Sequence, residues 1–341
     1  MSSWNDPELL KLFKQQIPLI DVRAPIEFQD GSIPFSVNLP ILNNEERALV
    51  GTCYKEQGQA AAIELGHQLV TGDIKTNRVS AWNAFIHQNP QAEVFCFRGG
   101  LRSKTACQWL AEAGLNKKPI EGGYKRMRTF FLSWLNDAPL PEMIKIGGPT
   151  GSAKSEFILK FTNIDLEKIA HHRGSAFGFM GQQPSQITFE NQLALELIRL
   201  SGKKIVVEDE SATIGKIVLP RRLFSHMQAA SMVILKVDQE QRIKNIFDLY
   251  VKDQALPFFL FSLEKIQKAL GGVNYQLVKV SMEKAFAEGK KLEHHQEWIR
   301  LLLDLYYDPH YSRGLERQSD KIIFSGNEKE VTTYLKQHGI L

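Results

Sequence analysis

The stretch FCFRGGLRSKTA, residues 95–106, places a cysteine at the end of an apolar run and just before a helical pattern. Backbone N–H groups of such a loop, and the positive end of the helix that follows, point at the Cys96 side chain. They favour the thiolate, which is the nucleophilic form of cysteine. The position therefore predicts that Cys96 is a catalytic nucleophile rather than a small core residue.

The neighbours of Cys96 strengthen this prediction. Arg98 and Arg102 bring positive charge to the loop. Gly99 and Gly100 allow the backbone to fold around an anion without side chains in the way. We therefore expect Cys96, Arg98 and Arg102 to form a catalytic group that faces a pocket for an oxyanion.

The first half of the chain alternates short apolar strands with helical stretches, which is typical of an α/β fold with a parallel sheet and helices on both faces. The expected strands end near residues 21, 39, 97 and 120, and the expected helices cover residues 44–66, 75–88 and 101–113. Pro139 and Pro141 break the pattern and indicate a linker. We predict one domain over residues 1–137 and a second over residues 138–341.

A second glycine-rich loop, GGPTGSAKS at residues 147–155, lies between an apolar strand and a helical pattern. In a P-loop of this kind, backbone N–H groups wrap a phosphate, a lysine neutralises it and a hydroxyl can bind Mg²⁺. Ala153 stands where the consensus has glycine, and its Cβ opposes a positive φ. This departure favours phosphate binding over ordinary ATP hydrolysis. The expected phosphate- or diphosphate-binding residues are Gly148, Thr150, Gly151, Ser152, Lys154 and Ser155.

An acidic cluster follows the next apolar strand, residues 204–207. After a P-loop, the end of a neighbouring strand is where a second group that binds Mg²⁺ belongs. Glu208 and Asp209 are equally good candidates for binding Mg²⁺ or for acid–base catalysis.

Two polar segments are candidates for contacts with a substrate phosphate or base. The segment DLEKIAHHRGSAFG, residues 165–178, contributes His171, His172 and Arg173. The segment YYDPHYSRG, residues 306–314, contributes Tyr311 and Arg313, and helical stretches between residues 239 and 306 predict a helical extension of the second domain. No second pair of cysteines or histidines stands at ligand spacing, so we expect no structural zinc site.

The composition is that of a soluble globular protein, with 341 residues, 43% apolar and 23% charged. A formal charge of +4 permits a polyanionic partner without requiring one. The apolar runs are too short to span a bilayer, and the N-terminus lacks the order of a secretory signal. Three cysteines are too few for a disulfide scaffold. We therefore expect a cytoplasmic protein without a membrane partner.

The motifs IDVRAPIEFQDGSIPFSVNLP, CFRGGLRS and EGGY resemble those of rhodanese domains, and the resemblance covers residues 7–136. It implies that the cysteine carries sulfur or selenium as a persulfide or perselenide, and that Asp21 and Arg23 belong to a structural signature. The loop also fits the cysteine–five residues–arginine pattern of cysteine-dependent phosphatases, some of which share the rhodanese fold. Phosphatases usually have histidine before the cysteine, where this chain has Phe95, so that alternative is weaker but stays open.

The motifs TGSAKS, DLEKIAHHRGSAFG, VEDES and YYDPHYSRG extend the resemblance over most of the chain, which is similar to the tRNA 2-selenouridine synthases. The resemblance implies a transferase that geranylates a wobble 2-thiouridine of tRNA with geranyl diphosphate. Selenium from selenophosphate then replaces the geranylated sulfur. It further implies tRNA and a selenophosphate-producing enzyme as partners, Cys96 as the selenium-handling thiolate, and a P-loop that binds diphosphate with Mg²⁺. Phe258, Phe259 and Phe261 are candidates for the wall of a geranyl slot.

Two other classes of function stay open on the sequence alone. A hydrolase, either a cysteine-dependent phosphatase or a P-loop ATPase or kinase-like enzyme, would turn over a phosphate ester without tRNA or selenium. A non-catalytic sensor of phosphate or nucleotide would bind its ligand and form no product.

Overall fold

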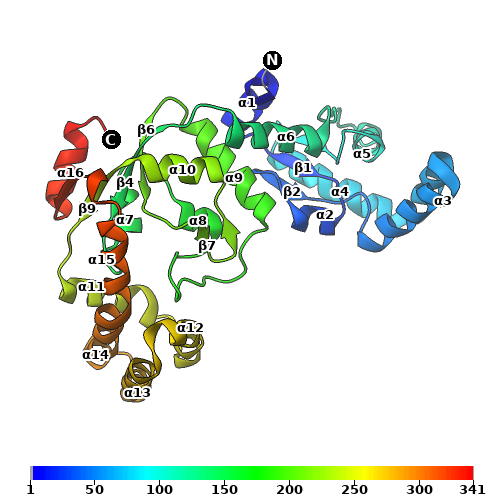
Figure 1. Cartoon of the computed structure of the whole chain (residues 1–341). Helices are drawn as coiled ribbons and strands as arrows, with labels where there is room; N and C mark the ends of the chain where they lie inside the picture. Colours follow the sequence, from blue (N-terminus) through cyan, green and yellow to red (C-terminus); the bar gives the residue numbers. More distant parts are fainter. Residues whose placement is uncertain (1–2, 341) are drawn as a thin grey trace. The chain divides into compact units, whose positions relative to one another are not determined.

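The computed structural model describes residues 3–340, which form two compact units (Figure 1). Unit 1 contains the chain up to residue 139 together with residues 184–199, and unit 2 contains residues 140–183 and everything from residue 200 onward. The predicted ranges differ from these units in two places, because residues 138–139 and residues 184–199 belong to unit 1. The chain therefore passes from one unit to the other three times, at residues 139/140, 183/184 and 199/200.

Unit 1 is built on a three-stranded parallel sheet in the order β2–β1–β3. The central strand β1 (Leu19–Asp21) is fully buried and pairs with β2 (Ser36–Asn38) on one side and β3 (Glu93–Phe95) on the other. Burial on both faces explains why the strand reads as a continuous apolar run. The helices of this part are α1 (Pro7–Lys14), α2 (Pro25–Asp30), α3 (Asn44–Leu69), α4 (Gly72–Gln88), α5 (Leu101–Glu112) and α6 (Gly123–Asn136), after a short turn of 3₁₀-helix, η1 (Ser3–Asn5).

Helix α3 is two helices that turn at Gly58, whose φ of 86° and ψ of −176° are not helical. Val50 before the turn lies against Gly66 after it, so the two halves run side by side. Figure 1 shows this helical hairpin as the blue projection at one end of unit 1. Most of its side chains are exposed, because only Glu46 and Ala62 are buried along its length.

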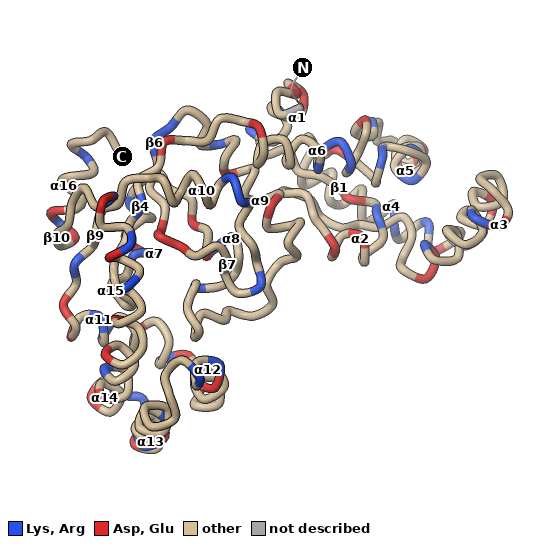
Figure 2. Tube along the Cα trace, in the orientation of Figure 1, with Lys and Arg blue, Asp and Glu red and all other residues tan. Residues whose placement is uncertain are grey.

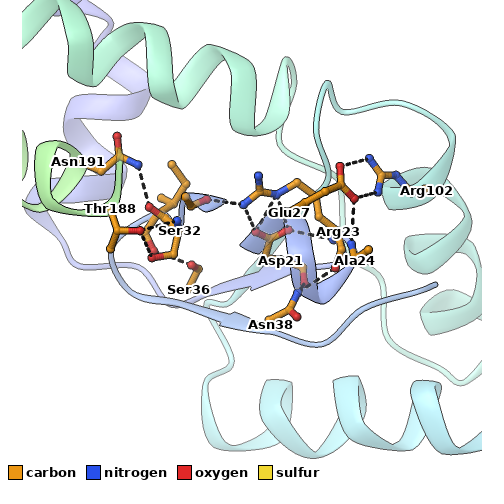
Figure 3. Close-up of polar contacts among 12 residues, drawn as sticks. Asp21, Arg23, Ala24, Glu27, Ser32, Ser36, Asn38, Arg102, Thr188 and Asn191 are labelled. Carbon is orange, nitrogen blue, oxygen red and sulfur yellow. Dashed lines mark hydrogen bonds and ion pairs between the residues drawn. The ribbon is translucent and has the colours of Figure 1, made fainter. Parts of the chain in front are cut away.

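The helix α9 (Gln186–Arg199) packs on α6 in unit 1. It buries Phe189, Leu193 and Leu197 on one face, a spacing of four residues that fits one side of a helix. Polar contacts add to the packing, because Asn191 Nδ2 donates to the Ser32 carbonyl at 2.7 Å and Arg128 Nη1 donates to Asn191 Oδ1 at 2.8 Å. Figure 3 shows Asn191 and Thr188 of this segment beside Ser32. These contacts explain why residues 184–199 belong to unit 1.

Unit 2 is built on a five-stranded parallel sheet in the order β10–β9–β4–β6–β5. The strands are β4 (Glu142–Gly147), β5 (Asn163–Ile164), β6 (Lys204–Glu208), β9 (Ser231–Leu235) and β10 (Ile322–Gly326), and a small antiparallel pair is formed by β7 (Thr213–Ile214) and β8 (Ile217–Val218). β4 lies at the centre, between β6 and β9. The parallel sheets in both units confirm the predicted mixed α/β class. Near this sheet lie α7 (Lys154–Ile158), α8 (Leu166–Ala170), α10 (Arg221–Ala229) and α16 (Glu328–Gln337).

The predicted helical extension is present between β9 and β10. It consists of α11 (Gln239–Ile246), η2 (Phe247–Val251), α12 (Leu256–Leu270), α13 (Gly272–Glu288), α14 (Leu292–Leu302), η3 (Leu303–Tyr307) and α15 (Asp308–Glu316), with η4 (Ser319–Lys321) leading back to the sheet. Phe259, Leu263 and Trp298 are at the centre of its apolar core. No helix within residues 3–340 combines the length and the apolarity that a membrane span needs.

Candidate functional site

The Cys96 loop joins the end of β3 to the start of α5, as the sequence predicts. Cys96 is only 3% exposed. Its Sγ lies 3.1 Å from Ser103 Oγ and 3.9 Å from the carbonyl oxygen of Gly100. Ser103 Oγ also donates to the Gly100 carbonyl at 3.2 Å, so the first turn of α5 fixes the hydroxyl that faces the sulfur. The thiol is therefore held inside the loop rather than presented on the surface.

The backbone of this loop is held by the start of α6. The N–H groups of Tyr124 and Lys125 donate to the carbonyls of Cys96 and Phe97, both at 2.9 Å. This close approach requires Gly123, whose φ is +51° and where a Cβ would lie 2.2 Å from the Cys96 carbonyl oxygen. The motif EGGY thus serves the cysteine loop as its backbone support.

The two predicted arginines of this loop have different surroundings. Arg102 binds Glu27 of α2 through two hydrogen bonds of 2.6 and 3.1 Å, shown at one side of Figure 3. Burial opposes the charge of Arg102, but the Glu27 carboxylate outweighs it and raises the pKa of the guanidinium. Arg98 is exposed, and its guanidinium carbon lies 5.7 Å from the centre of the Phe97 ring. Arg102 is therefore held near the loop by an ion pair, whereas Arg98 is exposed and has no ion pair in the described chain.

Asp21 and Arg23 form a buried ion pair at the end of β1, with a shortest distance of 2.6 Å. Arg23 also donates to the Gly31 carbonyl at 2.8 Å, and Figure 3 shows both contacts. Burial raises the pKa of Asp21 despite the Arg23 charge. Because Arg23 joins the end of β1 to the Gly31 carbonyl after α2, the pair suits the structural role that the sequence suggests.

The phosphate loop of unit 2 joins the end of β4 to α7, again as predicted. Lys154 Nζ donates to the Gly148 carbonyl at 2.8 Å, and Ser152 Oγ donates to the Pro149 carbonyl at 2.8 Å. Gly151 has a φ of +83°, which suits glycine. Ala153 has a φ of +56° immediately before α7, so this alanine occupies the left-handed conformation for which the consensus uses glycine. That conformation costs about 1–2 kcal/mol for a residue with a Cβ.

Helix α11 supports the phosphate loop from behind. Arg242 Nε donates to the Thr150 carbonyl at 2.8 Å, and Asn245 Nδ2 donates to the Gly151 carbonyl at 2.9 Å. Arg242 is 5% exposed, and its other nitrogens bind Asp308 at 2.5 and 3.0 Å. The loop is thus held by side chains of the helical extension, which lie about 90 residues further along the chain.

The phosphate loop opens into a cavity of about 620 Å³. This volume is within the range of small-molecule sites. Nine of the predicted residues line it, namely Gly148, Thr150, Gly151, Lys154, Ser155, Arg173, Glu208, Asp209 and Tyr311. The phenol rings of Tyr250 and Tyr307 form part of the opposite wall.

Three carboxylates gather beside the phosphate loop: Glu167, Glu208 and Glu210, with one oxygen of each within 4.8 Å of the others. Ser155 Oγ donates to Glu167 Oε2 at 3.1 Å. Glu208 is 4% exposed, and its Oε1 has no hydrogen-bond partner among the residues that the structure describes. Such a set of oxygen donors suits a hard cation such as Mg²⁺.

The electrostatics of this cluster reflect the crowding of like charges. Burial, followed by the charges of Glu208 and Glu210, raises the pKa of Glu167 to about 9. Burial and the Glu208 charge raise the pKa of Glu210 to about 7. Burial also raises the pKa of Glu208, against the effect of Lys154. The cluster favours a bound proton or a cation over three free negative charges.

Asp209 differs from Glu208, although the sequence gives no reason to prefer either. Lys145 on β4 is fully buried, and its Nζ lies 3.0 Å from Asp209 Oδ1 and also contacts Gln318. The charge of Asp209 is therefore already compensated by a lysine. Glu208 is the carboxylate that belongs to the cluster near Ser155.

The remaining predicted contact residues are divided between the cavity and the surface. Arg173 lines the cavity, donates to the Leu249 carbonyl at 3.2 Å and lies over the Tyr250 ring. Tyr311 lines it as well, and its hydroxyl is buried without a partner in the described part of the chain. Four predicted residues do not line it. Ser152 is buried within the phosphate loop. His171 bonds to the Gln182 carbonyl, burial lowers the pKa of His172, and Arg313 binds the Pro309 carbonyl of its own helix.

A small apolar void of about 30 Å³ adjoins the phosphate cavity, with Thr150, Tyr250 and Tyr307 in both linings. Its other walls include Phe177, Phe259 and Trp298. Of the phenylalanines that the sequence suggests for an apolar slot, Phe259 lines this void, whereas Phe261 is 61% exposed.

Sequence reasoning does not find several residues of the two sites, because their partners are distant in the chain. Glu27 meets Arg102 across 75 residues. Arg242 and Asn245 reach the phosphate loop from a helix whose sequence looks like any amphipathic surface helix. Glu167 lies inside the polar segment singled out at residues 165–178, but only the fold brings it to Glu208.

The charges of the chain are mixed, with Lys and Arg interleaved with Asp and Glu along both units (Figure 2). This agrees with the small net charge of +4. Electrostatic recognition would therefore depend on local groups of free cations rather than on one basic face.

Known proteins resemble this chain over nearly its full length. A family model described as the tRNA 2-selenouridine synthase AAA domain matches residues 141–340. The chain is 42% identical to the tRNA 2-selenouridine synthase of Shewanella sp. (strain ANA-3), covering 94% of this chain and 95% of that protein. It is 40% identical to the protein of the same name from Shewanella halifaxensis, with 97% and 98% covered. It is also 42% identical to that of Pseudomonas syringae pv. tomato, with 98% of each covered.

Proposed function

The chain belongs to the tRNA 2-selenouridine synthase family, and we propose that it converts wobble 2-thiouridine of tRNA to 2-selenouridine through an S-geranyl intermediate. Geranyl diphosphate and selenophosphate are the proposed co-substrates, and an enzyme that produces selenophosphate is a proposed partner. The reaction would take place in the cytoplasm. The observation that carries the proposal is a pair of strand–loop–helix sites, one with a buried cysteine and one with a phosphate loop. They occur in a chain that is 42% identical to a named tRNA 2-selenouridine synthase.

We assign geranyl transfer to the phosphate loop of unit 2. Lys154 and the loop N–H groups would bind the diphosphate and stabilise the negative charge that it gains as the leaving group. The cavity of about 620 Å³ has room for a small diphosphate ester. The apolar void beside it, with Phe177, Phe259 and Trp298, supports an arrangement in which the geranyl chain lies against the core of the helical extension.

Mg²⁺ is the cation that we propose for the carboxylate cluster. Ser155, Glu167, Glu208 and Glu210 would hold it, and the unpartnered buried oxygen of Glu208 supports this assignment. A bound Mg²⁺ would supply positive charge to the diphosphate oxygens. Arg242 and Asn245 would keep the loop carbonyls in place, and Arg173 and Tyr311 would donate hydrogen bonds from the opposite wall.

We assign selenium transfer to unit 1, which we propose is rhodanese-like. Its parallel sheet and the Cys96 loop at the end of β3 support that assignment. In the overall step, selenide from selenophosphate replaces the geranylated sulfur at C2, geranylthiolate leaves and water takes up the phosphoryl group. Cys96 is the proposed selenium-handling thiolate, with the Ser103 hydroxyl in hydrogen-bond contact with the sulfur and Arg102 as the nearby fixed charge.

The test is a reconstituted reaction. The purified full chain is incubated with tRNA that carries wobble 2-thiouridine, geranyl diphosphate, Mg²⁺ and selenophosphate, and the nucleosides are identified by mass spectrometry. S-geranylated 2-thiouridine should form with geranyl diphosphate alone, and 2-selenouridine only after selenophosphate is added. Hydrolysis of ATP or of a phosphate ester without either nucleoside would support the hydrolase alternative instead.

A further inference from the structure

An exposed aromatic ring follows the candidate nucleophile directly. Val94, Phe95 and Cys96 are at most 3% exposed, whereas Phe97 is 38% exposed. A ring of this size is usually buried, because its transfer out of water is favourable. An exposed ring one residue from a catalytic cysteine is therefore a candidate contact for the substrate.

The orientation of this ring is fixed from the core outward. Phe97 stacks on Tyr124, with ring centres 5.8 Å apart and planes at 22°. Tyr124 in turn lies against Arg23, whose guanidinium carbon is 3.8 Å from the centre of the Tyr124 ring. Arg23 is 2% exposed and bound to Asp21. Phe97 is thus the solvent-facing end of a series of planar groups that begins at a buried ion pair. Because the Phe97 side chain is already held in place, a further planar group could stack on it with little loss of Phe97 side-chain entropy.

Cations without an ion-pair partner in the described chain lie on the segments next to the ring. Arg98 and Lys125 are exposed, and the structure gives neither side chain an ion pair within residues 3–340. Lys104, in the first turn of α5, is exposed in the same way. By contrast, the neighbouring Arg126 and Arg128 are bound to Asp6 and Glu190. Arg98, Lys104 and Lys125 thus put uncompensated positive charge at the cysteine loop and in the first turns of α5 and α6.

An exposed aromatic ring among free cations is typical of sites that bind single-stranded nucleic acid, where bases stack on rings and cations contact phosphates. We propose that Phe97 is the platform on which the wobble uridine stacks, with Arg98 and Lys125 contacting the flanking phosphates. This inference rests on the proposed function, because it takes tRNA as the substrate. It assigns the anticodon loop to unit 1, and it makes Phe97 a positioning residue that brings the base to Cys96.

The proposal is tested by a double-mutant cycle on binding. The ligands are an anticodon stem–loop RNA with wobble 2-thiouridine and the same RNA with an abasic wobble position. The proteins are the full-length wild type and Phe97→Ala, and dissociation constants are measured by fluorescence anisotropy at one fixed salt concentration. For the wild type, loss of the base should weaken binding about tenfold, within the range known for stacking on an aromatic ring.

Phe97→Ala should weaken binding of the intact RNA by a similar factor and bind the abasic RNA no worse than the wild type does. Phe97→Trp should restore the affinity and Phe97→Leu should not, because leucine is apolar but has no ring. Additive losses in the cycle, or wild-type affinity in Phe97→Leu, would overturn the stacking role. So would a wild type that does not bind the intact RNA.

A matched control separates this site from a general effect of exposed rings. Phe261 in α12 is 61% exposed and lies under Lys265 at 4.3 Å, so it also combines a ring with a cation. Phe261→Ala should leave both affinities unchanged, and all variants should keep the wild-type Tm. If the wild type forms no selenouridine but the cycle shows coupling, the proposed function fails and the stacking site stands. If 2-selenouridine forms but the cycle shows no coupling, the proposed function stands and the stacking site fails.

Discussion

The Cys96 loop and the phosphate loop have the same local order, a buried parallel strand, a glycine-rich turn and a helix, yet they are stabilised in opposite ways. The Cys96 loop is held by backbone: α6 N–H groups bind its carbonyls, and glycines occupy the tight positions. The phosphate loop is held by side chains, chiefly Arg242 and Asn245, and it has an alanine in a left-handed conformation.

The two loops also differ in charge and in access. Cys96 is almost fully buried, and the nearest guanidinium, that of Arg102, is compensated by Glu27. The phosphate loop opens to a large cavity, beside which three carboxylates remain without a lysine or arginine partner in the described chain. The Cys96 loop thus buries its reactive atom beside a compensated guanidinium, whereas the phosphate loop keeps uncompensated carboxylates beside an open cavity.

The largest effect on activity should come from replacing the sulfur atom of Cys96. Cys96→Ser should lower 2-selenouridine formation by about a thousandfold or more, because the alcohol is a far weaker nucleophile than the thiolate. If the phosphate loop carries out geranyl transfer without Cys96, the rate of S-geranylation should stay within about twofold of that of the wild type. Nucleoside mass spectrometry reads both steps from one sample. Cys53→Ser, in α3, is the control, and loss of both steps in Cys96→Ser would contradict the division.

The next largest effect tests the backbone support of the Cys96 loop. Gly123→Ala places a Cβ 2.2 Å from the Cys96 carbonyl at a φ of +51°, so it should lower the free energy of unfolding of unit 1. We expect a loss of about 2 kcal/mol or more. Gly100→Ala is the matched control in the same loop, since a Cβ there meets no atom within 4 Å. Equal Tm values for the two variants would show that the close approach does not hold the loop.

The carboxylate cluster beside the phosphate loop predicts that the stability of the protein depends on pH. The folded pKa values of about 9 for Glu167 and about 7 for Glu210 lie above their ordinary value of 4.5. The folded state therefore binds more protons than the unfolded state in this interval, and without Mg²⁺ stability should fall as the pH rises from about 4.5 to about 9. Mg²⁺ should oppose the fall, because the cation takes the place of the protons.

Thermal unfolding between these pH values, with and without Mg²⁺, measures the effect. Glu167→Gln cannot ionise, so its Tm should depend less on pH than that of the wild type. An unchanged pH dependence in Glu167→Gln would place the titrating groups elsewhere.

The smallest effect concerns the alanine of the phosphate loop. Ala153→Gly removes the Cβ at a φ of +56° but gives the unfolded chain more freedom, so the gain in unfolding free energy should be below about 1 kcal/mol. Gly151→Ala should do the opposite, because a Cβ there lies 2.9 Å from the Arg242 carbonyl. Chemical denaturation should show that the free energy of unfolding changes in opposite directions in the two variants. A change in the same direction would show that the φ angle does not determine which residue is favoured at these positions.

Much of the fold could be predicted from local pattern. The predicted helix at residues 101–113 is α5, which ends one residue earlier, and the predicted strand at residues 204–207 is β6 with Glu208 added. Periodicity also predicts the long helices of the extension, because α12, α13 and α14 each bury residues at helical spacing. The helix after the phosphate loop begins at Lys154 rather than Glu156, since the left-handed Ala153 caps it.

What could not be predicted depends on contacts between distant residues. The pattern at residues 186–199 indicates an amphipathic helix, but nothing in it indicates that its apolar face packs on α6 of unit 1. The choice between Glu208 and Asp209 likewise depends on Lys145, which is hidden in an apolar strand. The local sequence pattern predicts which helices and strands form. The partners of a charged side chain depend instead on which strands are neighbours in the sheet.

The place of α9 has a consequence for synthesis on the ribosome. Unit 1 includes residues 184–199, so its last helix leaves the ribosome only after the whole phosphate loop has done so. Until then the surface of α6 that receives Phe189 and Leu193 has no cover from α9. A nascent chain released at the apparent boundary near residue 139 would thus lack a structural part, although the Cys96 motif would be complete. The phosphate loop must therefore be translated before α9 can cover α6, the helix that supports the Cys96 loop.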